Sequence, residues 1–222
     1  MKHPDAGKRP FPFGFRCRCI LTAVVMGVVA LASFAPSAEQ PVPDRAILAQ
    51  VETYLNSVGT MRARFLQVSG TGAYAEGTAF LSRPGRMRLE YDPPSPLLII
   101  ADGRHIIYYD AKLEQTSYIG LEVTPAGILL RSNIRLKDDV TVTDMQRIPG
   151  AVEVSLVQTK DPLAGELTLL FEERPFALKQ WRVRDAQGQV VTVSLYDAES
   201  SLALDPNLFK FTDPNFFKPQ DN

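Results

Sequence analysis

RPGRMRLEYDPPSPLLIIADGRHIIYYDAKLEQT, residues 83–116, holds three strand-like runs between short turns of proline and glycine. In the first run, Met87, Leu89 and Tyr91 alternate with charged residues, which is the period-two pattern of a half-exposed antiparallel strand. The next two runs, residues 97–101 and 106–109, are apolar without a break. A strand that is apolar on both sides must be covered on both, so we expect a second layer of protein or a ligand against it.

Similar short runs continue on both sides of this stretch. Links such as Asp102-Gly103 and Pro149-Gly150 favour antiparallel hairpins between neighbours. Even spacing of short strands is typical of a barrel or a sandwich. The pattern predicts about eleven strands, at residues 61–69, 76–83, 86–92, 96–101, 104–110, 113–119, 140–147, 151–158, 165–173, 176–185 and 189–197.

Two helical segments are predicted beside the strands. The first starts at Asp44 and ends before Gly59, because Ile47, Val51 and Leu55 recur at helical spacing. The second opens with Thr124-Pro125 as N-cap and first turn and ends near Arg131, followed by a short helix or irregular segment over 134–139. Their apolar sides need burial, which the concave face of an open half-barrel offers. The prediction is therefore a mainly β fold with a helical lid over an apolar interior.

The N-terminus has the features of a secretory signal peptide. Residues 1–18 carry five basic residues and one acidic residue, an apolar run over 20–32 follows, and small residues fill 33–38. The apolar run is shorter than the roughly 20 residues that a membrane-spanning helix needs. We expect cleavage between Ala35 and Ala38, export to the periplasm, and one domain over residues 39–222.

Cleavage would remove both cysteines, Cys17 and Cys19, and leave neither a disulfide nor a thiol nucleophile. It would also lower Lys+Arg from 24 to 19 and Asp+Glu from 25 to 24, which gives a net charge of −5. This balance, without any basic stripe among aromatic residues, argues against nucleic acid or an anionic membrane surface as a partner.

Signals of enzymatic chemistry are nearly absent from the sequence. The single histidine after residue 38, His105, lies in an apolar strand, where a surface or packing role is the commoner one. No nucleophile elbow, phosphate-binding glycine loop or metal-ligand spacing occurs. Neighbouring carboxylates such as Glu172 and Glu173 point to opposite faces of a strand and form no acid–base pair. We therefore expect neither enzymatic activity nor a cofactor.

An apolar pocket under a lid suits acyl chains, since each buried methylene contributes about 0.8 kcal/mol. The apolar strands alone are equally explained as ordinary core. Arg83, at the end of an apolar strand, is the candidate lid latch, because its five donors can bind several carbonyls at a helix C-terminus. A solvated strand-end arginine is the alternative for Arg83.

The chain resembles the LolA family of periplasmic outer-membrane lipoprotein carriers along essentially its whole length after residue 38. Thr124-Pro125 before the central helix and Phe209-Lys210-Phe211 near the C-terminus also fit this family. The motifs that carry the resemblance are Phe65-Leu66-Gln67, Glu76-Gly77-Thr78, the heptapeptide SRPGRMR from Ser82 to Arg88, the hexapeptide LIIADG from Leu98 to Gly103, and the segment from Ile107 through Asp110 to Glu114-Gln115.

The resemblance implies an incomplete eleven-stranded barrel that takes acylated lipoproteins from an inner-membrane ABC transporter and delivers them to an outer-membrane receptor. It implies a latch role for Arg83 and a loop position in contact with the transporter for Met87. Pro125-Ala126-Gly127 is smaller than is usual in the family, which implies a looser lid or a larger cavity. We expect a monomer. Candidate cavity or lid contacts are Leu89, Ile99, Ile107, Ile128 and Leu129.

Two other functions stay open on the sequence alone. A relative of this family can carry another amphiphile, or can sense lipids or lipoproteins and signal to a membrane partner. A sensor would usually need a further interaction domain, and the sequence indicates none. Strand register decides which of the candidate residues face inward, and one sequence does not fix register.

Overall fold

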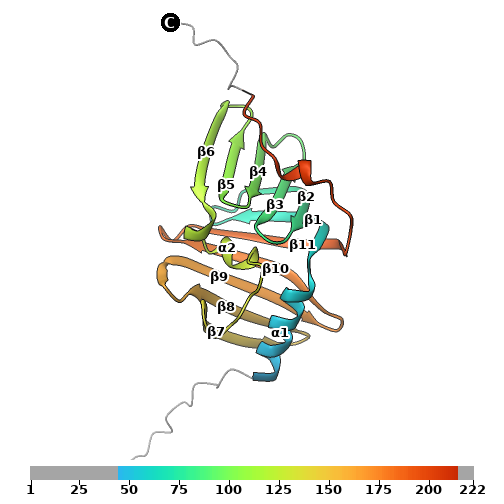
Figure 1. Ribbon diagram of the computed structural model, residues 1–222, viewed down its shortest axis with the longest axis vertical. Helices are drawn as coiled ribbons and strands as arrows, with labels where there is room; N and C mark the ends of the chain where they lie inside the picture. Colours follow the sequence, from blue (N-terminus) through green and yellow to red (C-terminus); the bar gives the residue numbers. More distant parts are fainter. Residues whose placement is uncertain (1–44, 215–222) are drawn as a thin grey trace, which may run out of the picture. The chain divides into compact units, whose positions relative to one another are not determined.

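A computed structural model describes residues 45–214 of the chain, and the expected signal peptide, residues 1–38, lies outside them. Strands dominate this part of the chain (Figure 1). All eleven predicted strands are present, with ends within a few residues of the predicted ones. The elements are α1 Arg45–Ser57, β1 Thr60–Ser69, β2 Tyr74–Ser82, β3 Arg86–Tyr91, β4 Leu97–Asp102, β5 His105–Asp110, β6 Gln115–Gly120, η1 Leu121–Val123, α2 Ala126–Leu129, β7 Val140–Ile148, β8 Ala151–Gln158, β9 Asp161–Glu173, β10 Phe176–Asp185, β11 Val190–Ser200 and η2 Pro206–Phe209.

The strands form one antiparallel sheet in the order β6-β5-β4-β3-β2-β1-β11-β10-β9-β8-β7. Each half of the sheet is a run of hairpins, and the first and last strands of the chain, β1 and β11, join the halves. The edge strands β6 and β7 do not pair with each other among the described residues, so the barrel stays open. The prediction of an incomplete antiparallel barrel is confirmed.

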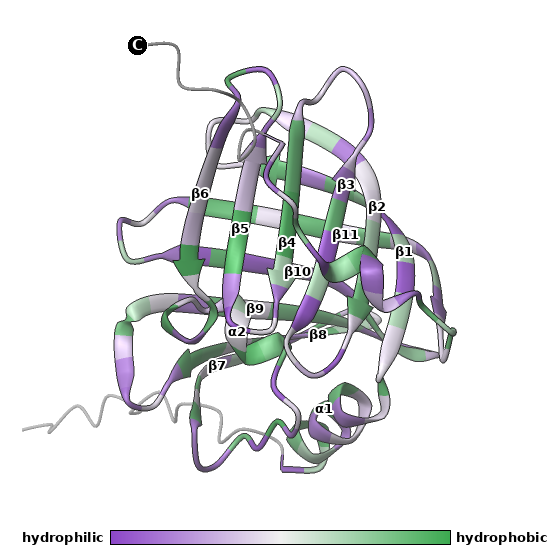
Figure 2. Cartoon of the chain, turned by 45° about the horizontal axis from the view of Figure 1, so that its top comes forward, coloured by the Kyte–Doolittle hydropathy of each residue, from purple (hydrophilic) through white to green (hydrophobic). Residues whose placement is uncertain are grey.

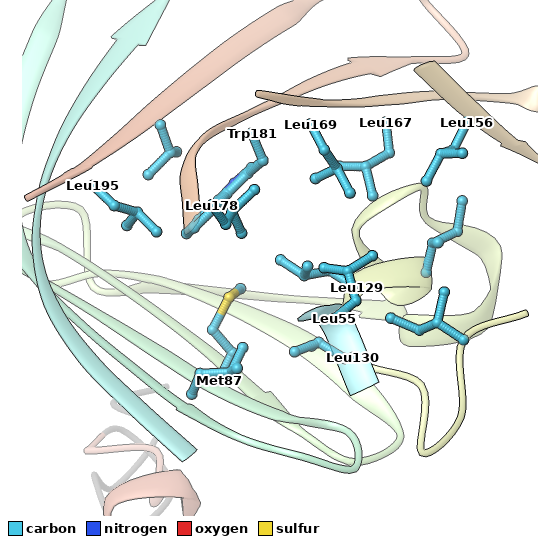
Figure 3. Packing of buried hydrophobic residues seen from close by; sticks show 14 of the residues in the cluster. Leu55, Met87, Leu129, Leu130, Leu156, Leu167, Leu169, Leu178, Trp181 and Leu195 are labelled. Atoms are coloured by element: carbon cyan, nitrogen blue, oxygen red, sulfur yellow. The ribbon is translucent and has the colours of Figure 1, made fainter. Parts of the chain in front are cut away.

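The core fills the concave face of the sheet under α1 and α2. Helix α1 buries Ile47, Val51 and Leu55, the apolar stripe that its sequence predicts. Leu129 of α2 belongs to the same buried cluster, and Figure 3 shows Leu55 and Leu129 facing Leu169 of β9. The two helical segments therefore cover the inner face of the sheet, as expected for a lid. None of the helices in residues 45–214 is long and apolar enough to cross a membrane.

The segment around α2 differs in detail from the prediction. Pro125 is the N-cap residue, and the Thr124 hydroxyl donates to the Leu121 carbonyl oxygen at 2.9 Å instead of capping α2. Gly127 is required by a close approach, since a Cβ there would lie 2.3 Å from the Leu121 carbonyl oxygen. The small residues of this segment thus allow tight packing of α2 on the preceding turn. Residues 134–139 form no helix.

The outer face of β3, β4 and β5 is covered by the C-terminal residues that include η2. Arg88 Nη1 on β3 donates to the Leu208 carbonyl oxygen at 3.0 Å. Further along, the ring of Phe211 lies 5.5 Å from that of Tyr109 on β5. This covering layer explains why β4 and β5 are apolar on both faces (Figure 2): one face meets the interior and the other meets the end of the chain.

Candidate functional site

A cavity of about 400 Å³ lies between the inner face of the sheet and the η1–α2 segment. It is open to solvent at one side, where Ile119 and Val123 are 41% and 64% exposed. Figure 3 shows Trp181 of β10 and Met87 of β3 extending toward each other from opposite walls. The lining consists of Gln67, Met87, Leu89, Ile99, Ile106, Tyr108, Ile119, Val123, Thr124, Pro125, Ala126, Ala164, Trp181, Val183, Asp185, Ala186, Gln187, Gln189, Val191 and Val193.

The predicted cavity residues are brought together in part. Leu89 and Ile99 are register partners on β3 and β4, and both line the cavity. Ile128 and Leu129 belong to α2 and are buried in the core beneath it, while the preceding residues Pro125 and Ala126 form the cavity wall. The N-terminal end of α2 thus faces the cavity, and its C-terminal end is buried in the core.

The prediction for Ile107 is corrected by the register of β5. Ile106 and Tyr108 line the cavity, so Ile107 between them points to the outer face. Ile107 and its partner Ile100 are nearly fully buried there, outside the main core cluster, on the strands that the C-terminal residues cross.

The prediction for Met87 is corrected as well. Met87 is not in a loop but inside β3, between Leu81 and Ala101 on the neighbouring strands. Its side chain is 7% exposed and lines the cavity. Met87 therefore contacts the cavity in this structure, and its contact with a partner protein stays a prediction.

Arg83 connects α1 with the residues that follow α2. Its Nε and Nη2 donate to the Arg131 carbonyl oxygen at 2.9 and 2.6 Å. Its Nη1 donates to the Leu55 carbonyl oxygen and, at 3.5 Å, to that of Val58, while Nη2 reaches Asn56 Oδ1 at 3.4 Å. These carbonyls include ones that the end of a helix leaves without an intrahelical donor.

The environment of Arg83 is electrostatically unusual. Burial lowers the pKa of the guanidinium from its ordinary value, because a charged group loses hydration there. Arginine nevertheless stays charged in proteins. The positive charge is held by carbonyl dipoles, and no carboxylate within residues 45–214 forms an ion pair with it.

Other side chains that sequence reasoning missed hold the same segment. Asn56 of α1 binds both backbone groups of Ile134, donating to its carbonyl oxygen and accepting from its N–H at 2.9 Å each. Glu52 accepts from the Leu136 N–H at 3.0 Å. Gln158 of β8 donates to the Glu122 carbonyl oxygen at 2.9 Å. Polar side chains that bind irregular backbone have no periodic pattern, so these residues could not be found from the sequence.

The size and lining of the cavity suit an apolar ligand. Ligand pockets span about 300–1,000 Å³, so a cavity of about 400 Å³ is small for several long chains. No group of three or more His, Cys, Asp or Glu in the described part of the chain could hold a metal ion. His105 lies outside the lining and is half exposed, 3.9 Å from Asp102.

Several proteins with similar sequences are described as outer-membrane lipoprotein carrier proteins. An outer-membrane lipoprotein carrier protein of Methylococcus capsulatus is 30% identical over 174 residues, covering 74% of this chain and 83% of its own. The carrier protein of the same description from Pseudomonas aeruginosa is 31% identical, covering 77% of this chain and 86% of its own. A solved LolA superfamily protein from Nitrosomonas europaea is 9% identical with a TM-score of 0.43. The match covers 73% of this chain and 97% of the solved one.

The sequence profile described as "Outer membrane lipoprotein carrier protein LolA" matches residues 56–212. The match includes Arg83, the cavity and the lid, and it covers more than half of the chain. This protein therefore belongs to the LolA family of outer membrane lipoprotein carriers.

Proposed function

We propose that this protein is a periplasmic carrier that receives acylated lipoproteins at the inner membrane and delivers them to the outer membrane. The observation that carries the proposal is the apolar cavity beneath the η1–α2 lid. Acyl chains placed there would be removed from water, which stabilises the complex by about 0.8 kcal/mol per buried methylene. The basic, apolar and small-residue segments of residues 1–38 support export to the periplasm.

Loading requires the lid to separate from the sheet, because the closed cavity is small. Arg83, which bonds α1 and the residue after α2 together, is the proposed latch of the empty protein. Ligand binding would break these bonds, so part of the free energy of acyl burial is opposed by their loss. The complex is then weaker than burial alone would make it, which permits transfer to the next partner. We propose a lipoprotein-releasing ABC transporter as donor and an outer-membrane receptor as acceptor.

The test is release of lipoproteins from the inner membrane. Purified protein is added to spheroplasts of the parent bacterium whose lipoproteins carry a radioactive acyl label, with serum albumin at equal concentration as control. We expect labelled lipoproteins to appear in the supernatant in a one-to-one complex with this protein and not with albumin. An unlabelled supernatant, together with phospholipid or another amphiphile bound to the purified protein, would replace this proposal by a carrier of that amphiphile or a sensor of it.

A further inference from the structure

The wall of the apolar cavity contains a buried hydrogen-bond donor without a partner. Trp181 lines the cavity and is 6% exposed. Its indole Nε1–H forms no hydrogen bond with any residue from 45 to 214. Buried polar groups are normally paired, and an unpaired one calls for a ligand or a water molecule at that position.

A second donor lies on the same wall and is held in place. Gln67 also lines the cavity, and its Oε1 accepts from the Tyr91 hydroxyl at 2.7 Å. The Tyr91 ring packs edge-on against Phe65 with 5.2 Å between centroids, and burial raises the Tyr91 pKa, so its hydroxyl stays protonated. With Oε1 engaged, Gln67 has its amide Nε2 donors left, and these have no partner in the described part of the chain.

Strand register places the two donors at the same level of the sheet, one on each side of β11. Gln67 on β1 and Trp181 on β10 are both register partners of Val193 on β11, the strand between them. All three side chains line the cavity. Strands lie about 4.8 Å apart, so the backbones of Gln67 and Trp181 are about 10 Å apart, with Val193 between them.

The two free groups, Trp181 Nε1–H and Gln67 Nε2–H, are both donors, so they suit an acceptor. Hydrocarbon offers none, while the carbonyl oxygen that links an acyl chain to its head group is an acceptor. We propose that Trp181 Nε1–H and Gln67 Nε2–H bind an ester carbonyl of the acylated cargo and so fix how deep its chains enter. This inference rests on the proposed carrier function, and it names the part of the ligand that the cavity recognises beyond its chains.

The test uses the fact that Trp181 is the only tryptophan of the chain. The ¹⁵N-labelled protein therefore gives one indole N–H signal, which reports on Trp181 alone. The probes are a synthetic lipopeptide with two ester-linked palmitoyl chains, its analogue with two ether-linked hexadecyl chains, and free palmitate. We expect the diester lipopeptide to move the indole proton downfield, as a new hydrogen bond does, and the ether analogue to leave it upfield.

Affinity measurements add an independent readout. One net hydrogen bond corresponds to about 2- to 10-fold in affinity, so the protein should bind the diester tighter than the ether analogue by about that factor. Trp181→Phe keeps the ring and removes the donor, and should reduce or remove this preference while binding of the ether analogue is unchanged. Gln67→Glu keeps the acceptor for Tyr91, removes the amide donors and should weaken binding of the diester selectively. The matched control is Tyr118→Phe, which removes a hydroxyl that is outside the cavity lining.

The outcomes separate this inference from the proposed function. Equal affinity for the diester and ether lipopeptides, with the same indole shift, would overturn the carbonyl site and leave the carrier function standing. A downfield shift with palmitate but not with the diester would also overturn it and identify a site for free fatty acid. Failure of both lipopeptides to bind would contradict the carrier function itself, and the carbonyl site with it.

Discussion

At the scale of single residues, Arg83 connects the end of α1 to the segment that follows α2. A guanidinium after an apolar strand and before Pro84-Gly85 suggested a side chain that binds helix-end carbonyls, and its contacts with Leu55 and Arg131 are of that kind. Trp181 shows the opposite case. A tryptophan that alternates with polar and charged residues predicts the buried face of a strand. That its N–H lacks a partner is visible only once the surrounding side chains are placed.

We predict that Arg83→Leu still takes up lipoprotein but releases it poorly. The substitution removes hydrogen bonds of the closed, empty state, each of which contributes about 1.5–3 kcal/mol for a charged donor. The loaded state is therefore more stable relative to the empty one. The affinity of the Arg83→Leu variant for lipoprotein should rise at least about tenfold. The measurement is transfer of bound lipoprotein to outer-membrane vesicles. Arg135→Leu, at an exposed arginine in the same segment, is the control, and normal transfer by the Arg83 variant would remove the latch role.

At the scale of elements, the strands were predictable and the direction of their side chains was only partly so. Turn residues such as Asp102-Gly103 mark where each strand ends, and this information is local. In β3, alternation put Met87, Leu89 and Tyr91 on one face, and Leu89 of this face lines the cavity. In β5 both faces are apolar, because the interior and the C-terminal residues each need a covered face. The apolar pattern therefore could not show whether Ile106 or Ile107 faces the cavity.

The attachment of α1 to the segment after α2 gives a prediction at this scale. Asn56→Ala should destabilise the protein by about 1–3 kcal/mol, because it leaves the N–H and carbonyl of the buried Ile134 without partners. The Ile134 amide should exchange with deuterium faster. The control is Ser57→Ala, whose hydroxyl bonds only to the Tyr54 carbonyl in the same helix. Unchanged exchange at Ile134 would show that Asn56 does not hold this segment.

At the scale of the whole molecule, the two halves of the sheet share one core. Phe65 and Leu89 in one half belong to the same buried cluster as Leu169 and Trp181 in the other. β1 and β11 link the halves through an antiparallel ladder with one register shift, between Arg62 and Arg64. The domain should therefore unfold as one unit, in spite of its open edge.

We predict a single unfolding transition in urea. Trp181 fluorescence reports on the cavity wall, far-ultraviolet circular dichroism reports on the whole sheet, and the two curves should coincide. Leu169→Ala should move both midpoints together, with a loss of about 2–5 kcal/mol for a fully buried leucine. A fluorescence transition well before the circular dichroism transition would show that the halves unfold separately.

The chemistry of the Arg83 contacts also decides which changes in pH or salt concentration can weaken them. The acceptors of Arg83 are backbone carbonyls and one amide oxygen, none of which titrates, and arginine keeps its proton at any pH that a bacterium meets. Acidification therefore leaves these bonds intact, and they involve no carboxylate that added salt could screen. The hydrogen bonds of Arg83 are thus indifferent to the acidity and salinity of the surroundings.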